Sequence, residues 1–147
     1  MTPAKQCMVD TNVLVYSTVK GNPWHEEARD WLMSLRKQGV TLLVTPQILR
    51  EYMVVLTRGQ IFERQFTVAE VLEAVDGLLP WLQVLDETEK TSGLLRELVR
   101  RYQVRGKRVH DANIVAVMIA HGVARLATYN RTDFDGFQEI VLEPLSD

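Results

Sequence analysis

The chain has 147 residues, of which 46% are hydrophobic and 24% are charged, and its formal net charge is -2. This length suits one domain with its own hydrophobic core, and the composition excludes a chain that is disordered over most of its length. The net charge lacks the basic excess of typical nucleic-acid-binding proteins, so a nucleic-acid partner requires a local basic patch, a bound metal ion, or both.

The cysteine content and the apolar runs restrict the compartment. The single cysteine, Cys7, excludes an internal disulfide and a multi-thiolate metal site, and its place in an apolar run predicts an inert buried thiol. No apolar run approaches the roughly 20 residues needed to cross a bilayer. No apolar segment typical of a signal peptide follows Lys5. We therefore expect a protein of the reducing cytoplasm with no membrane partner.

Short apolar runs alternate with helical patterns along the chain. Strands are expected at about 6–9, 40–44, 83–85, 125–128 and 139–142. Helices are expected from Val13 to Val19, from Pro23 with Asn22 as N-cap to Gly39, from Pro46 to Gly59, from the capping box at 67–70 to Leu79, from the N-cap pair Asp86 and Glu89 to about Tyr102, and from near Asp111 to Gly122, with a loop over 130–136. This alternation predicts a layered α/β fold with a mostly parallel sheet.

Four acidic residues follow strand-like runs. Asp10 ends the first run, Glu51 lies in the second turn of the helix after the second run, Asp111 stands at a helix start, and Asp133 lies in a turn-rich loop. Ligands of open α/β sheets bind at the carboxyl edge of the strands, so we expect these carboxylates to converge there. Converging carboxylates repel one another, and Mg²⁺ or Mn²⁺ relieves that repulsion with oxygen ligands. Activation of water by such an ion favours phosphodiester hydrolysis.

Each acid taken alone also has a structural explanation. Asp10 could cap a helix, and Asp111 could interact favourably with the positive end of a helix. Glu51 could pair with a neighbouring arginine, and Asp133 could shape a turn. Only the set of four favours a metal site.

Four segments resemble the acidic motifs of the PIN-domain ribonucleases, at residues 9–14, 49–52, 109–114 and 128–134. In order, spacing and overall length the chain is most similar to the VapC-like toxins of bacterial and archaeal toxin–antitoxin pairs. The resemblance covers residues 5–143 and implies a single PIN-like nuclease domain. It also implies a three-layer α/β/α sandwich around a mostly parallel central sheet, and Mg²⁺- or Mn²⁺-dependent cleavage of RNA.

The resemblance further implies roles for individual residues. Asp10, Glu51 and Asp111 match the core acidic triad that holds the metal and carries catalysis. Asp133 matches the fourth and more variable acid, whose role Asn130 could share. The residues that would orient the carboxylates or a water are Asn12, Thr128 and Asn130. Members of the family commonly form homodimers and pair with a small VapB-like antitoxin, so RNA, an antitoxin and a second copy are the expected partners.

A basic loop precedes the third acid. Arg105, Lys107 and Arg108 lie just upstream of Asp111. They could hold an RNA backbone beside the metal site, or they could form a solvated loop. The sequence leaves both interpretations open.

Two other functional classes remain open. A phosphohydrolase could use Asp10 as a phospho-accepting nucleophile, but the dehalogenase-like motif needs a second aspartate where Asn12 stands. A PIN-fold module could bind RNA or protein without any chemistry. All four acidic positions are filled, which favours the enzyme.

Overall fold

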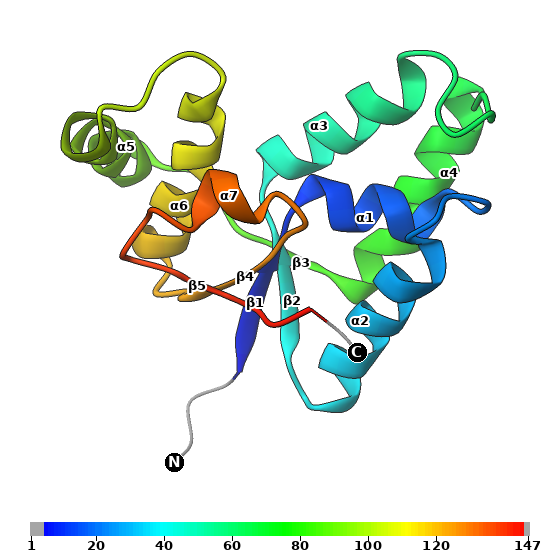
Figure 1. Ribbon diagram of the computed structural model, residues 1–147, viewed down its shortest axis with the longest axis horizontal. Coiled ribbons are helices and arrows are strands. Elements are labelled where there is room, and N and C mark those ends of the chain that lie inside the picture. The colour runs from blue at the N-terminus through cyan, green and yellow to red at the C-terminus, as the bar shows by residue number, and fades with distance from the viewer. Residues whose placement is uncertain (1–4, 146–147) are drawn as a thin grey trace.

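The strands form one parallel sheet at the centre of the molecule. The computed structural model describes residues 5–145. The strand order is β3-β2-β1-β4-β5, and every neighbouring pair is parallel (Figure 1). The strands are β1 (Gln6–Val9), β2 (Thr41–Val44), β3 (Gln83–Val84), β4 (Arg125–Ala127) and β5 (Val141–Leu142).

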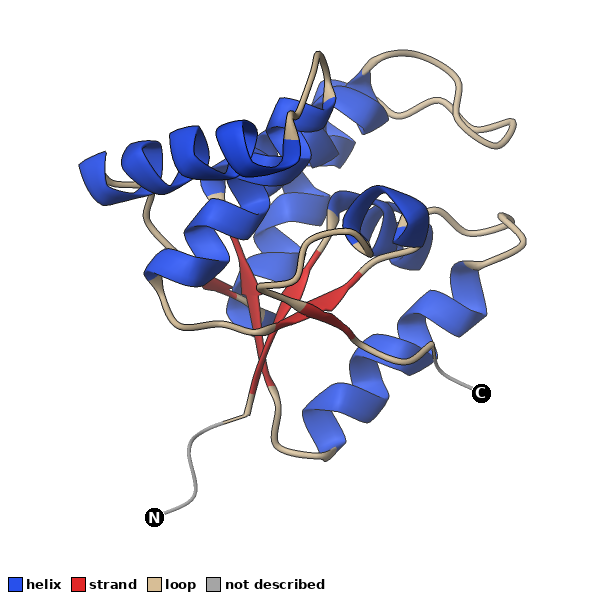
Figure 2. Cartoon of the chain, turned by 60° about the vertical axis from the view of Figure 1, so that its left-hand side comes forward, coloured by secondary structure: helices blue, strands red, loops and turns tan. Residues whose placement is uncertain are grey.

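Helices connect these strands and surround the sheet (Figure 2). Those of residues 5–145 are α1 (Thr11–Thr18), α2 (His25–Lys37), α3 (Pro46–Thr57), α4 (Val68–Leu78), the 3-10 helix η1 (Leu79–Trp81), α5 (Glu89–Tyr102), α6 (Arg108–Ala120) and α7 (Arg131–Phe134). None of them is long and apolar enough to cross a membrane.

The helices form two layers because the chain adds strands first on one side of β1 and then on the other. It moves from β1 to β2 and then β3, so right-handed crossovers put α1, α2 and α4 on one side of the sheet. It then returns past β1 to β4, which puts α5 and α6 on the other side (Figure 1). The expected three-layer α/β/α sandwich is therefore confirmed.

The central strands are apolar because both of their faces are covered. Cys7, Met8 and Val9 of β1 are fully buried, and Met8 lies beside Leu43 of β2 and Leu126 of β4. Such continuous apolar runs are typical of parallel sheets. The predicted burial of the Cys7 thiol is confirmed, and burial raises its pKa to about 12, which disfavours the reactive thiolate.

Two predicted helix caps are wrong. Asn22 is buried, donates to the carbonyls of Tyr16 and Val19, and accepts from the Trp24 backbone N–H. It therefore fixes the turn after α1, and α2 begins only at His25. Asp86 does not cap α5 either, because Thr88 precedes this helix and is paired with its third position, Thr91.

Other boundaries shift by a few residues. The helix α1 begins at Thr11, because the Asp10 side chain caps it, and α6 begins at Arg108 rather than near Asp111. The helix α4 ends at Leu78, and Pro80 lies in η1. The expected loop over 130–136 contains the short helix α7. The capping box at 67–70 is confirmed by hydrogen bonds in both directions.

Candidate active site

The first acid lies where the sheet connections diverge. The chain leaves β1 toward β2 and leaves β4 toward β5, on the opposite side, and ligands of such sheets bind in the crevice at that point. Asp10 directly follows β1 and Thr128 directly follows β4. The Thr128 hydroxyl donates to Asp10 Oδ2 at 2.8 Å, and the Asp10 N–H donates to the Ala127 carbonyl at 2.9 Å.

The Asp10 carboxylate is buried and firmly oriented. It is only 5% exposed. Besides the Thr128 hydroxyl it accepts from the Thr11 N–H at 2.8 Å and from Asn12 Nδ2 at 3.1 Å. Burial raises the pKa of Asp10, the bonds from Thr128 and Thr11 oppose that rise, and the charge of Glu51 adds to it. Asp10 thus caps α1 and also presents a carboxylate at the crevice.

Asn12 and Thr128 connect the ends of β1 and β4. Asn12 Oδ1 accepts from the Tyr129 N–H at 3.0 Å, while its amide donates to Asp10. The Thr128 hydroxyl accepts from the Asn130 N–H at 3.0 Å. Two of the three predicted orienting residues, Asn12 and Thr128, therefore contact Asp10 directly.

Glu51 is held by two residues that the motif reasoning missed. Thr11 Oγ1 donates to Glu51 Oε2 at 3.0 Å, and Gln47 Nε2 donates to Oε1 at 2.9 Å. Gln47 also donates to the His110 carbonyl at 2.9 Å and accepts from Asn113 Nδ2 at 2.7 Å. Gln47 therefore connects α3 with α6. Its one signal in the sequence is its position four residues before Glu51, on the same helix face.

Asp111 lies in the first turn of α6 and is partly buried. Its pKa is raised to about 6, by burial first and then by the charges of Asp10, Asp133 and Glu51, while the Arg108 guanidinium lowers it. No side-chain hydrogen bond joins its carboxylate to another of residues 5–145. The Asp111 carboxylate is therefore destabilised by the neighbouring negative charges, and the Arg108 guanidinium opposes this effect.

One pocket, at the carboxyl edge of the sheet, brings the three core acids together. Its volume is about 370 Å³, and Asp10, Glu51 and Asp111 are among the residues that line it. Asn130 also lines this pocket. Asp133 is not among the lining residues, and it acts on the group through its effect on Asp111. We call this hollow the acid pocket.

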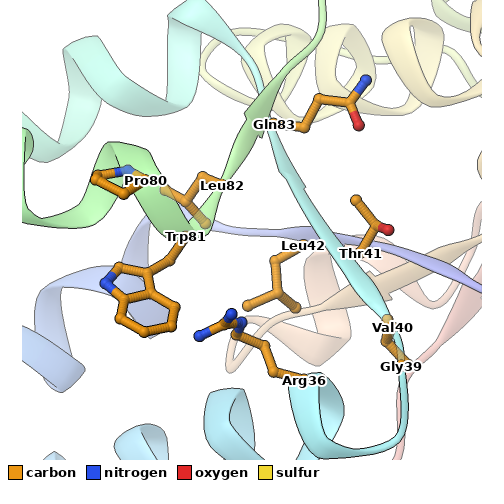
Figure 3. A pocket seen from close by; sticks show the side chains of 9 residues that line it. All are labelled: Arg36, Gly39, Val40, Thr41, Leu42, Pro80, Trp81, Leu82 and Gln83. Atoms are coloured by element: carbon orange, nitrogen blue, oxygen red, sulfur yellow. The ribbon is translucent and has the colours of Figure 1, made fainter.

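A second hollow of similar volume has a different character. It lies between the end of α2 and the segment that joins η1 to β3, and none of its lining residues is acidic (Figure 3). The Arg36 guanidinium lies over the Trp81 ring, 3.7 Å from its centroid. The lining of this hollow therefore offers a hard cation no carboxylate ligand.

Comparison with known families decides the classification. A sequence model of the family described as PIN domain matches residues 7–139. The chain belongs to the PIN-domain family. The matched region contains the three core acids and all of the strands except β5 and the first residue of β1.

Related proteins share the length and fold of this PIN domain. Ribonuclease VapC48 of Mycobacterium tuberculosis is 27% identical over 141 residues, which are 93% of this chain and 96% of the relative. The structure of VapBC2 from Rickettsia felis, bound to a DNA fragment from their promoter, matches with a TM-score of 0.72 and 21% identity over 94% of this chain and 97% of that one. The structure of Mycobacterium tuberculosis VapC20, described as a Sarcin-Ricin loop cleaving toxin, matches with a TM-score of 0.66 and 19% identity over 91% of this chain and 98% of that one.

The acid pocket of the PIN domain suits a hard divalent ion by its donors. All of its acidic ligands offer oxygen, and Asp111 has both oxygens available to a ligand. Within residues 5–145, however, no three His, Cys, Asp or Glu side chains are gathered closely enough to hold an ion by themselves. The three core acids thus line one pocket, and a shared ion stays a prediction. This arrangement fits Mg²⁺ or Mn²⁺, which bind through one or two carboxylates and complete their shells with water and phosphate.

The basic loop lies beside the acid pocket at the start of α6. Arg105, Lys107 and Arg108 are all exposed. Arg108 Nη2 donates to the Asp133 carbonyl at 3.0 Å, and its charge lowers the pKa of Asp111. The loop is thus placed near the acids, and its contact with RNA stays a prediction.

Proposed function

We propose that residues 5–143 form one PIN-like nuclease domain that cleaves RNA with the help of Mg²⁺ or Mn²⁺. The observation that carries this proposal is the acid pocket, which Asp10, Glu51 and Asp111 all line near the point where the sheet connections diverge. The names of relatives such as Ribonuclease VapC48 support the same activity.

The residues of the acid pocket have different roles in the proposed reaction. A bound divalent ion supplies activation of water and stabilisation of charge on the phosphate. Asp10 and Glu51 are oriented by Thr11, Asn12 and other hydrogen-bond donors before any ligand arrives. Asp111 supplies a carboxylate that is destabilised without a cation. The exposed basic loop is suited to hold the RNA backbone beside these acids.

The phosphohydrolase alternative is weaker. A phospho-accepting aspartate must reach the phosphorus atom of its substrate, whereas Asp10 is 5% exposed and both of its oxygens accept hydrogen bonds. Asn12 occupies the position of the second aspartate of that mechanism. Its side chain hydrogen-bonds to Asp10 and to the Tyr129 backbone N–H.

The activity is tested with purified protein, Mn²⁺ and a mixture of RNAs. Asp10→Asn keeps the size of the side chain but removes its charge, and it should lower cleavage at least about a hundredfold, beyond the usual effect of losing an outer-shell partner. Asp76→Asn, at an exposed carboxylate of α4, is the matched control and should retain full activity. Equal cleavage by wild type and Asp10→Asn would indicate a contaminating nuclease. RNA binding without cleavage in either protein would favour the silent binding module.

We also propose that the protein acts in the cytoplasm as the toxin of a VapBC-type pair, with a small antitoxin encoded beside it and a homodimeric assembly. The relatives named VapC and VapBC support this assignment. Expression of the chain alone should arrest growth of a bacterial host, and co-expression of the neighbouring small reading frame should restore it. Arrest by Asp10→Asn to the same extent as by wild type would contradict the toxin proposal.

A further inference from the structure

The acid pocket has a second, apolar part. Besides its acids it is lined by Val15, Tyr16, Val55, Ile61 and Phe62. A pocket that only held an ion and a phosphate would need no aromatic lining. The volume of about 370 Å³ lies within the range of about 300–1,000 Å³ typical of sites for small organic groups.

A strained turn places Phe62 at this pocket. Phe62 and Glu63 both have positive φ, at 48° and 64°. They are the central residues of a tight turn that Ile61 and Arg64 close with two backbone hydrogen bonds, of 2.7 and 2.9 Å. Consecutive left-handed residues normally require glycine or asparagine, and a bulky side chain is disfavoured there. The turn therefore retains an unfavourable backbone conformation while presenting a phenylalanine ring.

Phe62 belongs to a connected group of aromatic rings. Tyr16 and Trp24 stack with their centroids 4.8 Å apart. Phe62 meets Tyr16 edge-on at 6.0 Å and Trp24 at 6.1 Å. Trp24 is 40% exposed and Phe62 is 37% exposed, whereas Trp31, at helical spacing from Trp24, is only 2% exposed and packs in the core. The exposed rings therefore form one surface that continues into the acid pocket.

We propose that Phe62, supported by the partly buried Tyr16, forms a stacking surface for an unpaired nucleobase of the RNA whose backbone lies at the carboxylates. The inference rests on the proposed ribonuclease function and adds a base-binding position to it. Every base has a π-face that stacks on aromatic side chains, whereas a base paired within a duplex is not available to a recessed ring. RNA is favoured over a protein partner because the rings line the same pocket as the acids, so they contact whatever binds there.

Stacking and phosphate contact respond differently to salt, which makes the proposal testable. Phosphate contacts release counterions and give a steep salt dependence, whereas a ring carries no charge. Loss of the Phe62 ring should therefore weaken RNA binding by the same factor at low and high salt. Loss of a basic residue should instead flatten the salt dependence.

The test measures binding of a short fluorescent single-stranded RNA by anisotropy, in an Asp10→Asn background that removes cleavage. Phe62→Leu keeps an apolar side chain without a π-face and should weaken binding about 5- to 150-fold, the range found for one stacked base. Phe62→Tyr keeps the ring and should bind like its parent. Trp81→Leu, at an exposed aromatic residue outside the acid pocket, should also bind like its parent. Thermal melting of each variant confirms that it is folded.

An RNA that lacks a single base locates the stacked position. At that position the missing base should weaken binding to the parent but not to Phe62→Leu, because the two losses remove the same contact. Unchanged affinity of Phe62→Leu for the RNA would overturn the stacking proposal. An equal loss of affinity for single-stranded and duplex RNA on this substitution would overturn it too. If Phe62→Leu cleaves RNA as well as the wild type does, this inference alone is refuted. Absence of cleavage by the wild type would refute the ribonuclease function itself.

Discussion

Replacing Asp111 with asparagine is expected to stabilise the metal-free protein at neutral pH, although it removes a proposed ion ligand. The pKa of Asp111 is raised from 3.8 to about 6, by burial and then by the charges of Asp10, Asp133 and Glu51. The folded chain therefore holds this proton more tightly than the unfolded chain, and ionisation opposes folding. A shift of this size corresponds to about 3 kcal/mol, which solvent screening of a half-buried group reduces to about 1–2 kcal/mol.

The assay is urea unfolding in EDTA at several pH values. Asp111→Asn breaks no side-chain hydrogen bond within residues 5–145, so at pH 7 it should gain the full 1–2 kcal/mol, or about 3–6 °C in Tm. The favourable contribution of Asp111 to wild-type stability is complete below its unfolded pKa and is lost as the pH rises through about 6. The advantage of the variant should therefore vanish as the pH falls from 7 to about 4.

Addition of Mn²⁺ should make the wild type more stable than Asp111→Asn, because an ion that binds only the folded wild type stabilises it by mass action. Asp76→Asn, at an exposed carboxylate of α4, should change stability little at any pH. A variant less stable than wild type at pH 7 in EDTA would refute the reasoning. An advantage of constant size between pH 4 and 7 would show that electrostatic repulsion is not its cause.

Further substitutions test other contacts. Gln47→Met, which cuts the connection between Glu51 and α6, should lower cleavage about ten- to a hundredfold. It should also raise the Mn²⁺ concentration needed for half-maximal activity. If the variant needs no more Mn²⁺ than the wild type, Gln47 does not have this positioning role. Joint replacement of Lys107 and Arg108 by alanine should weaken RNA binding at low salt and reduce the salt slope by about 0.7 for each phosphate that the variant no longer binds. An unchanged slope would remove the basic loop from the RNA path. Thr67→Ala deletes a capping box and should lower the free energy of unfolding in urea by about 1 kcal/mol, and a loss near zero would show that α4 does not depend on its cap.

The order of the elements was predictable because burial leaves a pattern in the sequence. The run that ends at Val9 is apolar throughout since helices cover both faces of β1, and the acid after it marks the carboxyl edge of the sheet. Boundaries were less predictable where a side chain acts beyond its own turn. Asn22 precedes a proline as helix caps often do, but its partners are the carbonyls of Tyr16 and Val19 at the end of the preceding helix.

The candidate site was likewise predictable from the sequence only in part. Asp10, Glu51 and Asp111 carry motif spacing and were found from the sequence, and they line one pocket. The contact between Gln47 and Asn113 joins residues 66 positions apart, and no local pattern encodes it. Phe62 was missed for another reason, because its left-handed backbone is not accompanied by the glycine or asparagine that signals such a turn.

The pairing of β1 with β4 has a consequence for synthesis of the protein. The strand that carries Asp10 is synthesised before β4 and Thr128, which complete the surroundings of that carboxylate 118 positions later. At about 5–20 residues per second, roughly 6–24 seconds of elongation separate the two. Chains that terminate before β4 therefore never complete the acid pocket of the proposed ribonuclease.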